Sequence, residues 1–334
     1  MLNYVGRRVL QLIPLLIAIS IIIFVIIQLP PGDYLTMYIQ QLELAGTDVS
    51  EAQIELLKSQ YHLDEPLVQQ YFSWIGNIVF HGDFGLSLLW NQPVTEVIGE
   101  RITLTIVVSL MTLIFTWLIA LPIGIYSATH QYSIGDYIFT FIGFIGVSVP
   151  GFLIALVIIY AVFSQTGVAM TGLFSPEFVT APWGWAKIID MLKHMWLPVI
   201  IIGLSGTAGL IRTVRGMLLD ELGKQYVITA RAKGVPERRL LFKYPIRVAI
   251  NPIISTIGWT LPGIISGEAL VSIVLNLQTM GPVLMKALQS QDMYLAGSFL
   301  LITSTLTIIG TLISDILLAW LDPRIRFGGV TEEG

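Results

Sequence analysis

Six apolar runs constrain the fold of this 334-residue chain more than any other feature. A helix needs about 20 mainly apolar residues to cross the hydrocarbon core of a bilayer. Runs of about that length or more lie at 9–29, 102–126, 137–163, 195–215, 246–275 and 294–320. The sequence therefore predicts an all-α membrane protein with six transmembrane helices.

Composition agrees with this assignment. The chain is 54% hydrophobic and only 12% charged, which excludes an ordinary soluble domain. It has no cysteine, so disulfides, thiolate metal sites and cysteine nucleophiles are excluded. We expect no catalytic site and no metal site, because the four histidines fall in predicted cap or loop positions without metal-ligand spacing: His62, His81, His130 and His194.

The distribution of cations predicts the orientation. Arg7 and Arg8 precede the first run, and most other Lys and Arg fall on segments that would share the side of the N-terminus. Under the positive-inside rule, both termini are then cytoplasmic. The run 9–29 exceeds the apolar region of about 7–15 residues in a signal peptide. We therefore expect it to remain as the first transmembrane helix.

Prolines and small residues are expected to shape the helices. Pro122, Pro150, Pro198 and Pro262 lie within predicted spans, where each removes a backbone hydrogen bond and favours a kink. Proline is common in membrane helices, so no single one is diagnostic of a gate. The spacing Ser205-x-x-x-Gly209 would permit close approach of another helix.

The most cationic stretch, residues 224–252, has its own internal pattern. Gln225 to Lys233 has helical composition, Gly234 supplies a flexible joint, and Pro236 can begin a second short helix through Phe242. Small residues would let another protein approach this backbone, and cations surround them: Ala230, Ala232, Gly234, Arg231, Lys233, Arg238 and Arg239. Retention of the loop in the cytoplasm explains the charge, but it does not require the Ala-x-Ala-x-Gly order.

This stretch also carries a family resemblance. Tyr226-x-x-Thr229-Ala230-Arg231-Ala232-Lys233-Gly234 resembles the coupling-loop motif of permease subunits in binding-protein-dependent ABC importers of the dipeptide, oligopeptide and nickel group. Ile228 stands where the wider consensus has a glutamate, and the later I-x-L-P element is only loosely matched at Ile250-Asn251-Pro252. Further similarity covers nearly the whole chain, including Gly6-Arg7-Arg8, Leu29-Pro30-Pro31-Gly32-Asp33 and Leu321-Asp322-Pro323-Arg324-Ile325-Arg326.

The resemblance implies a type I ABC importer transmembrane fold with alternating access. It divides the chain into a first helix (1–29), an extracytoplasmic cap (30–101), a permease core (102–326) with a coupling loop at 216–245, and a cytoplasmic tail (327–334). The implied contacts with the ATPase are made by Tyr226, Thr229, Ala230, Arg231, Ala232, Lys233, Gly234 and Arg238. The implied location is the cytoplasmic membrane of a bacterium or archaeon.

The same resemblance implies the partners. They are a homologous second permease, two cytoplasmic ABC ATPases, an extracytoplasmic solute-binding protein and the lipid bilayer, with no nucleic acid. ATP and Mg²⁺ would be used by the ATPases and no cofactor would be bound by this chain, which has no G-x-x-x-x-G-K-[ST] sequence.

The cap has two open interpretations. A helix is expected to begin near Asp64 and Pro66 and to carry Tyr71, Phe72, Trp74 and Ile75, and an earlier helix is expected after Ser50. These aromatic side chains could form a small core with an interfacial belt, or a docking surface for the solute-binding protein. The two interpretations are compatible if only some of the rings face outward.

The transport pathway is expected near Glu268, Ser272 and Asn276. A charge inside a membrane costs at least a few kcal/mol, so Glu268 should face a pathway, a gate or a structural partner. Peptide-type relatives usually carry glutamate at the position of Ser272, and residues 268–277 resemble relatives of oligosaccharide uptake. Peptides and oligosaccharides therefore both remain open as cargo. The alternatives are a secondary transporter coupled to an ion gradient through Glu268 and a non-transporting scaffold subunit.

Overall fold

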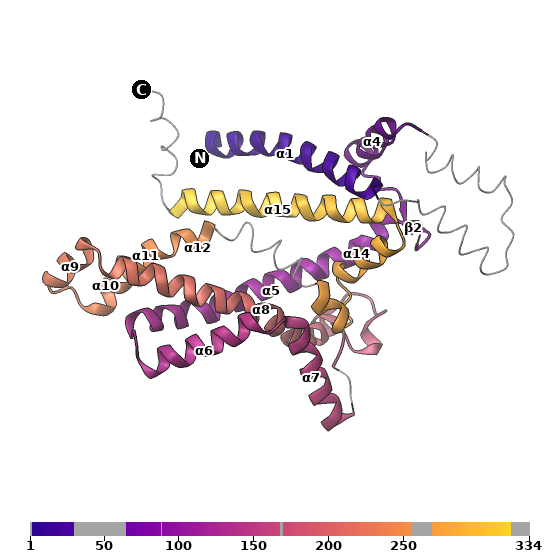
Figure 1. Ribbon diagram of the computed structural model, residues 1–334. Coiled ribbons are helices and arrows are strands. Elements are labelled where there is room, and N and C mark those ends of the chain that lie inside the picture. Colours follow the sequence, from indigo (N-terminus) through magenta and orange to yellow (C-terminus); the bar gives the residue numbers. More distant parts are fainter. Residues whose placement is uncertain (1, 30–64, 88, 168–169, 256–268, 322–334) are drawn as a thin grey trace. The chain divides into compact units, whose positions relative to one another are not determined.

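The computed structural model describes residues 2–29, 65–87, 89–167, 170–255 and 269–321, most of them in helices (Figure 1). The N-terminal part contains α1 (Leu2–Gln28), α4 (Leu67–Gly76), the π-helical turn η1 (Asn77–His81) and the strands β1 (Leu86–Ser87) and β2 (Gln92–Pro93). The central part contains α5 (Val94–Thr129), α6 (Ile134–Ser148), α7 (Gly151–Thr166), the 3₁₀ turn η2 (Pro176–Phe178) and α8 (Trp185–Leu222). After these come α9 (Gln225–Ala232), α10 (Glu237–Lys243), α11 (Pro245–Ala249), α12 (Asn251–Ser255), α14 (Met280–Gln289) and α15 (Met293–Leu321).

The chain forms two compact units. The first contains residues 1–7, 105–278 and 307–334, and the second contains residues 8–104 and 279–306. The helices α1, α5 and α15 each contribute residues to both units. Each unit therefore combines segments that are distant in the sequence.

Four described helices are long and apolar enough to cross a membrane: α1, α5, α8 and α15. They cover the predicted spans 9–29, 102–126, 195–215 and 294–320, which are confirmed by length and composition. The predicted span 246–275 runs through residues 256–268, which lie outside the described residues. The all-α prediction is confirmed, since the strands found in the described residues form one short hairpin.

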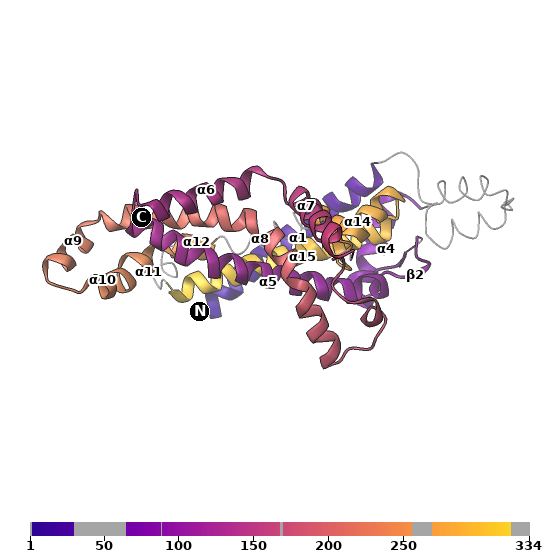
Figure 2. The ribbon, with the colours of Figure 1, turned by 90° about the horizontal axis from the view of Figure 1, so that it is seen from below.

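The predicted span 137–163 is not one kinked helix. It is divided into α6 and α7, which meet at 97° (Figures 1 and 2). Val149 is extended (φ −100°, ψ 120°), because the proline that follows it disfavours a helical conformation at this position. Pro150 itself occupies the cap position at the start of α7. Pro122 and Pro198, in contrast, lie inside the continuous helices α5 and α8, and Pro262 lies outside the described residues.

Close approach in the first unit depends on glycines facing bulky side chains. A Cβ added at Gly203 of α8 would lie 2.8 Å from Phe115 Cδ1 of α5, and one added at Gly124 would lie 2.7 Å from Val214 Cβ. A Cβ added at Gly209, in contrast, would meet nothing within 4 Å among the described residues. The close contact expected at Gly209 is therefore made at Gly203 instead.

The second unit is organised by a fully buried carboxylate. Asp292, just before α15, accepts hydrogen bonds from Ser87 Oγ (2.6 Å), from the Leu89 amide (3.1 Å) and from the Leu295 amide (3.1 Å). It therefore fastens the β1–β2 hairpin to the start of α15 and caps that helix. The role of Asp292 is not evident from the sequence, because Ser87 and Leu89 are more than 200 residues away in the chain.

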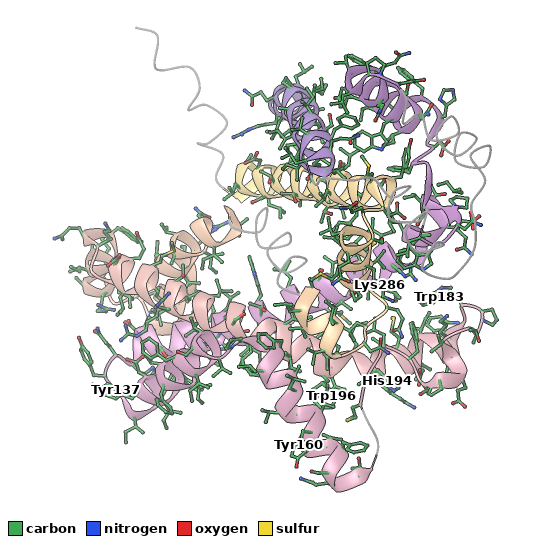
Figure 3. All side chains as sticks on the ribbon, turned by 45° about the vertical axis from the view of Figure 1, so that its right-hand side comes forward. Tyr137, Tyr160, Trp183, His194, Trp196 and Lys286 are labelled. Carbon is green, nitrogen blue, oxygen red and sulfur yellow. The ribbon has the colours of Figure 1, made fainter. Side chains whose placement is uncertain are left out.

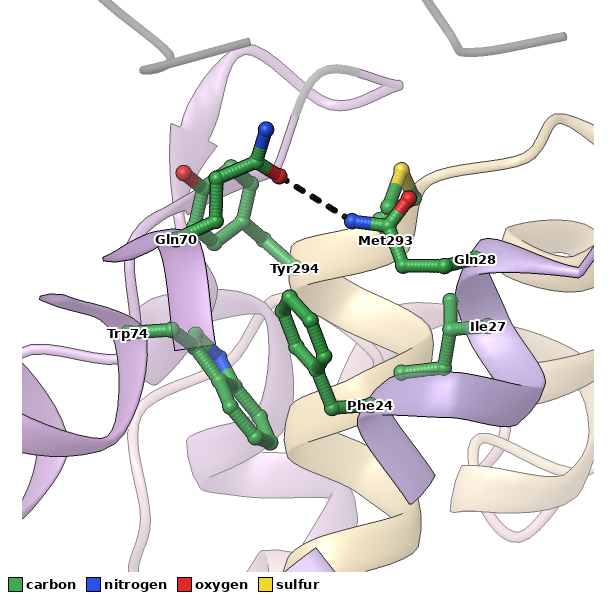
Figure 4. Close-up of a pocket in the computed structure, with 7 residues that line it drawn as sticks. All are labelled: Phe24, Ile27, Gln28, Gln70, Trp74, Met293 and Tyr294. Atoms are coloured by element: carbon green, nitrogen blue, oxygen red, sulfur yellow. Dashed lines mark hydrogen bonds between the residues drawn. The ribbon is translucent and has the colours of Figure 1, made fainter. Parts of the chain in front are cut away.

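The aromatic residues of α4 divide between core and surface. Trp74 is buried with Ile23, while Tyr71 meets Phe24 edge to face with 5.5 Å between ring centroids. Phe72 is exposed. The core interpretation is therefore correct for Trp74 and Tyr71, and Phe72 is one of the rings that face outward. Figure 4 shows the pocket beside this core, where Gln28 Nε2 donates to Gln70 Oε1 at 3.1 Å.

The close packing at Gly203 can be tested by substitution. Gly203→Ala should lower the free energy of unfolding by about 1 kcal/mol or more, because the added methyl group overpacks the contact with Phe115. Thermal unfolding in detergent would measure the change. Gly209→Ala in the same helix is the matched control and should not lower the midpoint; equal losses in both variants would contradict the packing argument.

Candidate functional site

The cationic stretch forms a hairpin of two short helices, α9 and α10, beyond the end of α8 (Figure 1). We call residues 225–243 the α9–α10 segment. The predicted helix from Gln225, the joint at Gly234 and the second helix after Pro236 are all confirmed.

The turn between the helices requires a glycine. Gly234 has φ +76°, its amide donates to Arg231 O (3.0 Å), and the Val235 amide donates to Ala230 O (3.3 Å). This pair of bonds is a Schellman motif, in which the residue after the helix cap adopts a left-handed conformation. A Cβ at Gly234 would meet nothing within 4 Å in the part of the chain that the structure describes. The outer side of the turn is therefore open to a partner.

The α9–α10 segment has a small core of its own. Val227 and Leu240 are fully buried, and Ala230 packs with them against Val235 and Tyr244. Ala230 is among the residues predicted to lie on the surface that a partner approaches. The structure instead places Ala230 inward, where its small side chain allows the two helices to pack.

An ion pair links the two helices across the turn. Arg231 Nη2 lies 2.6 Å from Glu237 Oε1, and Arg231 Nε lies 3.1 Å from Glu237 Oε2. Hydrogen bonding to Arg231 holds the pKa of Glu237 below its usual value. Both side chains are about half exposed, so solvent screens the pair and its effect on stability is small. Its main consequence is that the Arg231 guanidinium is held in one orientation.

A second polar contact ties α9 to the end of α8. The Tyr226 hydroxyl donates to the Glu221 carboxylate. Burial and this neighbouring carboxylate raise the pKa of Tyr226 to about 12, so the phenol stays protonated at neutral pH. The hydroxyl is therefore a permanent hydrogen-bond donor at the base of the segment.

The outward surface of the segment combines apolar and cationic side chains. Ile228 is 46% exposed and Phe242 is 62% exposed. Most of the residues predicted to contact a partner are exposed as well: Tyr226, Thr229, Arg231, Ala232, Lys233, Gly234 and Arg238. Exposed Ile and Phe among cations are typical of a protein-binding surface. Ile228 and Phe242 were not among the predicted site residues.

The segment is attached to the long helices through an apolar cluster. Ile246 and Ala249 of α11 pack against Leu218 of α8 and Ala128 of α5, and all four side chains are buried. Because protein interiors are closely packed, a displacement of α10 and α11 is transmitted to the ends of α5 and α8.

The predicted pathway residues are only partly brought together. Glu268 lies outside the described residues. Residues 269–274 are helical and include Ser272, which is fully buried. Asn276 is exposed and has φ +51°, a conformation that asparagine tolerates. The helix ends between Ser272 and Asn276, so these two residues do not continue one helical face.

The segment before α8 packs against this turn. The Gly172 amide donates to Leu275 O (2.7 Å), and the Leu173 amide donates to Gln278 Oε1 (3.2 Å). These contacts hold residues 275–278 in place. They also show that Asn276 lies in a turn that is hydrogen-bonded to the segment before α8.

The start of α8 carries a buried polar cluster that the sequence analysis missed. Asp190 accepts hydrogen bonds from the amide and hydroxyl of Ser175, both at 2.7 Å. Lys187 is buried, donates to Ala181 O (2.9 Å) and lies over the Trp183 ring at 4.8 Å. His194, predicted in a loop, lies within α8, because the helix begins ten residues before the apolar run (Figure 3).

Comparisons with known proteins agree with these features. The family described as the binding-protein-dependent transport system inner membrane component matches residues 120–327. The N-terminal family of the same membrane components matches residues 1–110. Together the two matches extend over almost the whole chain.

Two relatives match end to end. The chain is 34% identical over 331 residues to the oligopeptide transport system permease protein AppB of Bacillus subtilis (strain 168), covering 98% of this chain and 100% of the relative. It is 30% identical over 329 residues to the glutathione transport system permease protein GsiC of Escherichia coli (strain K12), covering 98% and 100%. The ion-gradient alternative at Glu268 has no support from these relatives. The chain belongs to the inner-membrane components of binding-protein-dependent transport systems and is a multi-pass permease subunit of the peptide group of ABC importers.

Proposed function

We propose that this chain pairs with a homologous permease and imports short peptides, driven by two cytoplasmic ABC ATPases and supplied by an extracytoplasmic solute-binding protein. The observation that carries the proposal is the α9–α10 segment, a preformed hairpin with exposed Ile228 and Phe242, surface cations and an open glycine turn. Such a surface suits a cleft in another protein. Because the α9–α10 segment is attached to α8 and α5, a protein that displaces the segment would also move these transmembrane helices.

The orientation follows from the same segment. Arg231, Lys233 and Arg238 are exposed there, and the positive-inside rule favours the cytoplasm for such a cationic loop. In the cytoplasm, the α9–α10 segment would also be accessible to the ATPases. Both termini are then cytoplasmic, and residues 30–101 face the other side of the membrane.

The energy source in this proposal is external to the chain. ATP and Mg²⁺ bind to the partner ATPases, and this subunit binds no cofactor. Closure of the ATPases displaces the α9–α10 segment, and the cluster around Leu218 and Ile246 carries the movement to α8 and α5. The transport pathway between the helices then opens to the outside and receives cargo from the solute-binding protein. After hydrolysis the helices return to the inward-open arrangement.

Peptide cargo is proposed because both relatives are named for peptide or glutathione transport. The sequence at 268–277, with Ser272 in place of the usual glutamate, favours oligosaccharides instead. The buried position of Ser272 weakens that argument for oligosaccharides, because a fully buried side chain does not select cargo by direct contact in this conformation.

Gly234→Asn tests the proposed contact with the ATPase. Asparagine tolerates the left-handed conformation, so the hairpin should fold while its outer surface gains a side chain. We expect association with the ATPases to weaken by about tenfold or more, since an interface defect of about 1.4 kcal/mol has that effect. Co-purification and binding of the ATPases would measure this change.

Gly76→Asn is the control for that experiment. Gly76 lies in α4, where an added Cβ also meets nothing within 4 Å among the residues described, and its proposed location is the opposite side of the membrane. ATPase association should be unchanged in this variant. Retained association in Gly234→Asn, with normal insertion, would exclude the turn as part of the interface.

The cargo is tested with the complete complex in proteoliposomes. ATP hydrolysis and uptake are compared with the solute-binding protein plus a peptide panel and with the same protein plus an oligosaccharide panel. We expect stimulation by peptides. Stimulation by oligosaccharides alone would show that the cargo is an oligosaccharide and not a peptide. Uptake that does not depend on nucleotide with either panel would contradict the importer mechanism.

A further inference from the structure

A buried carboxylate joins the start of α6 to the last turns of α8. Asp136 is 2% exposed, and it receives Arg215 Nε on Oδ1 and Arg215 Nη2 on Oδ2, both at 2.9 Å. The Tyr132 amide also donates to Oδ2 (3.0 Å). The Asp136 amide donates to Ser133 Oγ, the cap of α6, at 3.2 Å. The carboxylate is therefore fixed by two helices and the turn before α6.

Arg215 lies close to the apolar attachment of the α9–α10 segment. It precedes Leu218 by one helical turn, and Leu218 packs against Ile246 and Ala249 of α11. A movement that reaches Leu218 consequently reaches Arg215. The two-point contact between the guanidinium and the carboxylate fixes the relative orientation of these two groups as well as their distance. A single hydrogen bond does not fix the orientation.

The opposite end of α6 lies beside the candidate pathway. The helix packs along α8, and a Cβ at Gly146 would lie 3.2 Å from Leu204 Cγ (Figures 1 and 2). Beyond the break at Pro150, a Cβ at Gly151 would lie 3.4 Å from Val271 Cγ2. Val271 precedes the buried Ser272. The helix α6 therefore leads from the Asp136–Arg215 pair to the break at Pro150, and the first residue of α7 lies beside the segment that carries Ser272.

We propose that Asp136 and Arg215 are positioning residues for transport. Their pair ties α6 to α8, so that displacement of the α9–α10 segment moves the α6–α7 break against Val271 and Ser272. This inference rests on the proposed importer function. Without the pair, the ATPases still drive α8 through the Leu218 cluster, but α6 is tied to α8 by side-chain packing alone and follows it less closely.

The test measures cargo transported per ATP hydrolysed by the whole complex in proteoliposomes. Arg215→Lys retains the charge and loses the two-point contact, and Asp136→Asn retains the shape and loses the charge. Cargo per ATP should fall by about fivefold or more, the lower range of coupling between distant sites, while ATPase association stays normal. A parallel fall in hydrolysis and uptake, with cargo per ATP unchanged, would overturn the proposal.

Asp292→Asn is the matched control. Asp292 is also a buried carboxylate, but its hydrogen bonds join the β1–β2 hairpin to the start of α15. This variant should lose thermal stability without changing cargo per ATP. An equal loss of cargo per ATP in Asp292→Asn would overturn a specific role for Asp136.

A cross-link provides a second readout that does not depend on the single variants folding well. The chain has no cysteine, so Asp136→Cys with Arg215→Cys creates one addressable pair within it. A short thiol-to-thiol cross-linker should restore the cargo-per-ATP ratio that the unlinked double variant loses, and neither single cysteine variant should respond. No restoration in cross-linked protein would overturn the proposal. If the unmodified complex shows no nucleotide-driven uptake, the proposed function itself fails, which separates the two outcomes.

Discussion

The hydrocarbon core of the membrane requires every backbone amide and carbonyl to find its partner within the protein. The break between α6 and α7 shows how this chain meets that requirement at an interruption. The Val149 amide still donates to Ile145 O (3.1 Å), and the Leu153 amide donates to Pro150 O (3.0 Å). Proline has no amide hydrogen to satisfy. A turn of 97° is therefore possible there without leaving those amides unpaired.

Buried aspartates fasten this structure at three places. Asp136 joins α6 to α8, Asp190 holds Ser175 at the start of α8, and Asp292 joins the β1–β2 hairpin to α15. Each accepts at least one backbone amide hydrogen bond. An ionised carboxylate is costly to bury unless such donors surround it. Of the three, Asp136 joins two apolar helices, whereas Asp190 and Asp292 fix a loop and a hairpin to the start of a helix.

The sequence predicted local features well. Helical composition, Gly234 and Pro236 were sufficient for the α9–α10 segment, because its turn depends on residues adjacent in the chain. The sequence did not predict that Pro150 breaks a span whereas Pro122 and Pro198 do not, since neighbouring helices decide whether a proline is accommodated. The inward position of Ala230 was also missed, because it depends on contact with Leu240. For the same reason Asp136 and Arg215, 79 residues apart, were not paired in advance.

The internal core of the α9–α10 segment has a thermodynamic consequence. Val227 and Leu240 are fully buried in a cluster with Ala230, Val235 and the adjacent Tyr244, and the Schellman bonds at Gly234 close the turn in the isolated chain. Ordering a flexible loop at an interface opposes association, because side-chain and backbone freedom is lost. This hairpin is already ordered before any partner arrives. Its binding energy is therefore available for affinity and for moving helices, with little of it consumed in folding the loop.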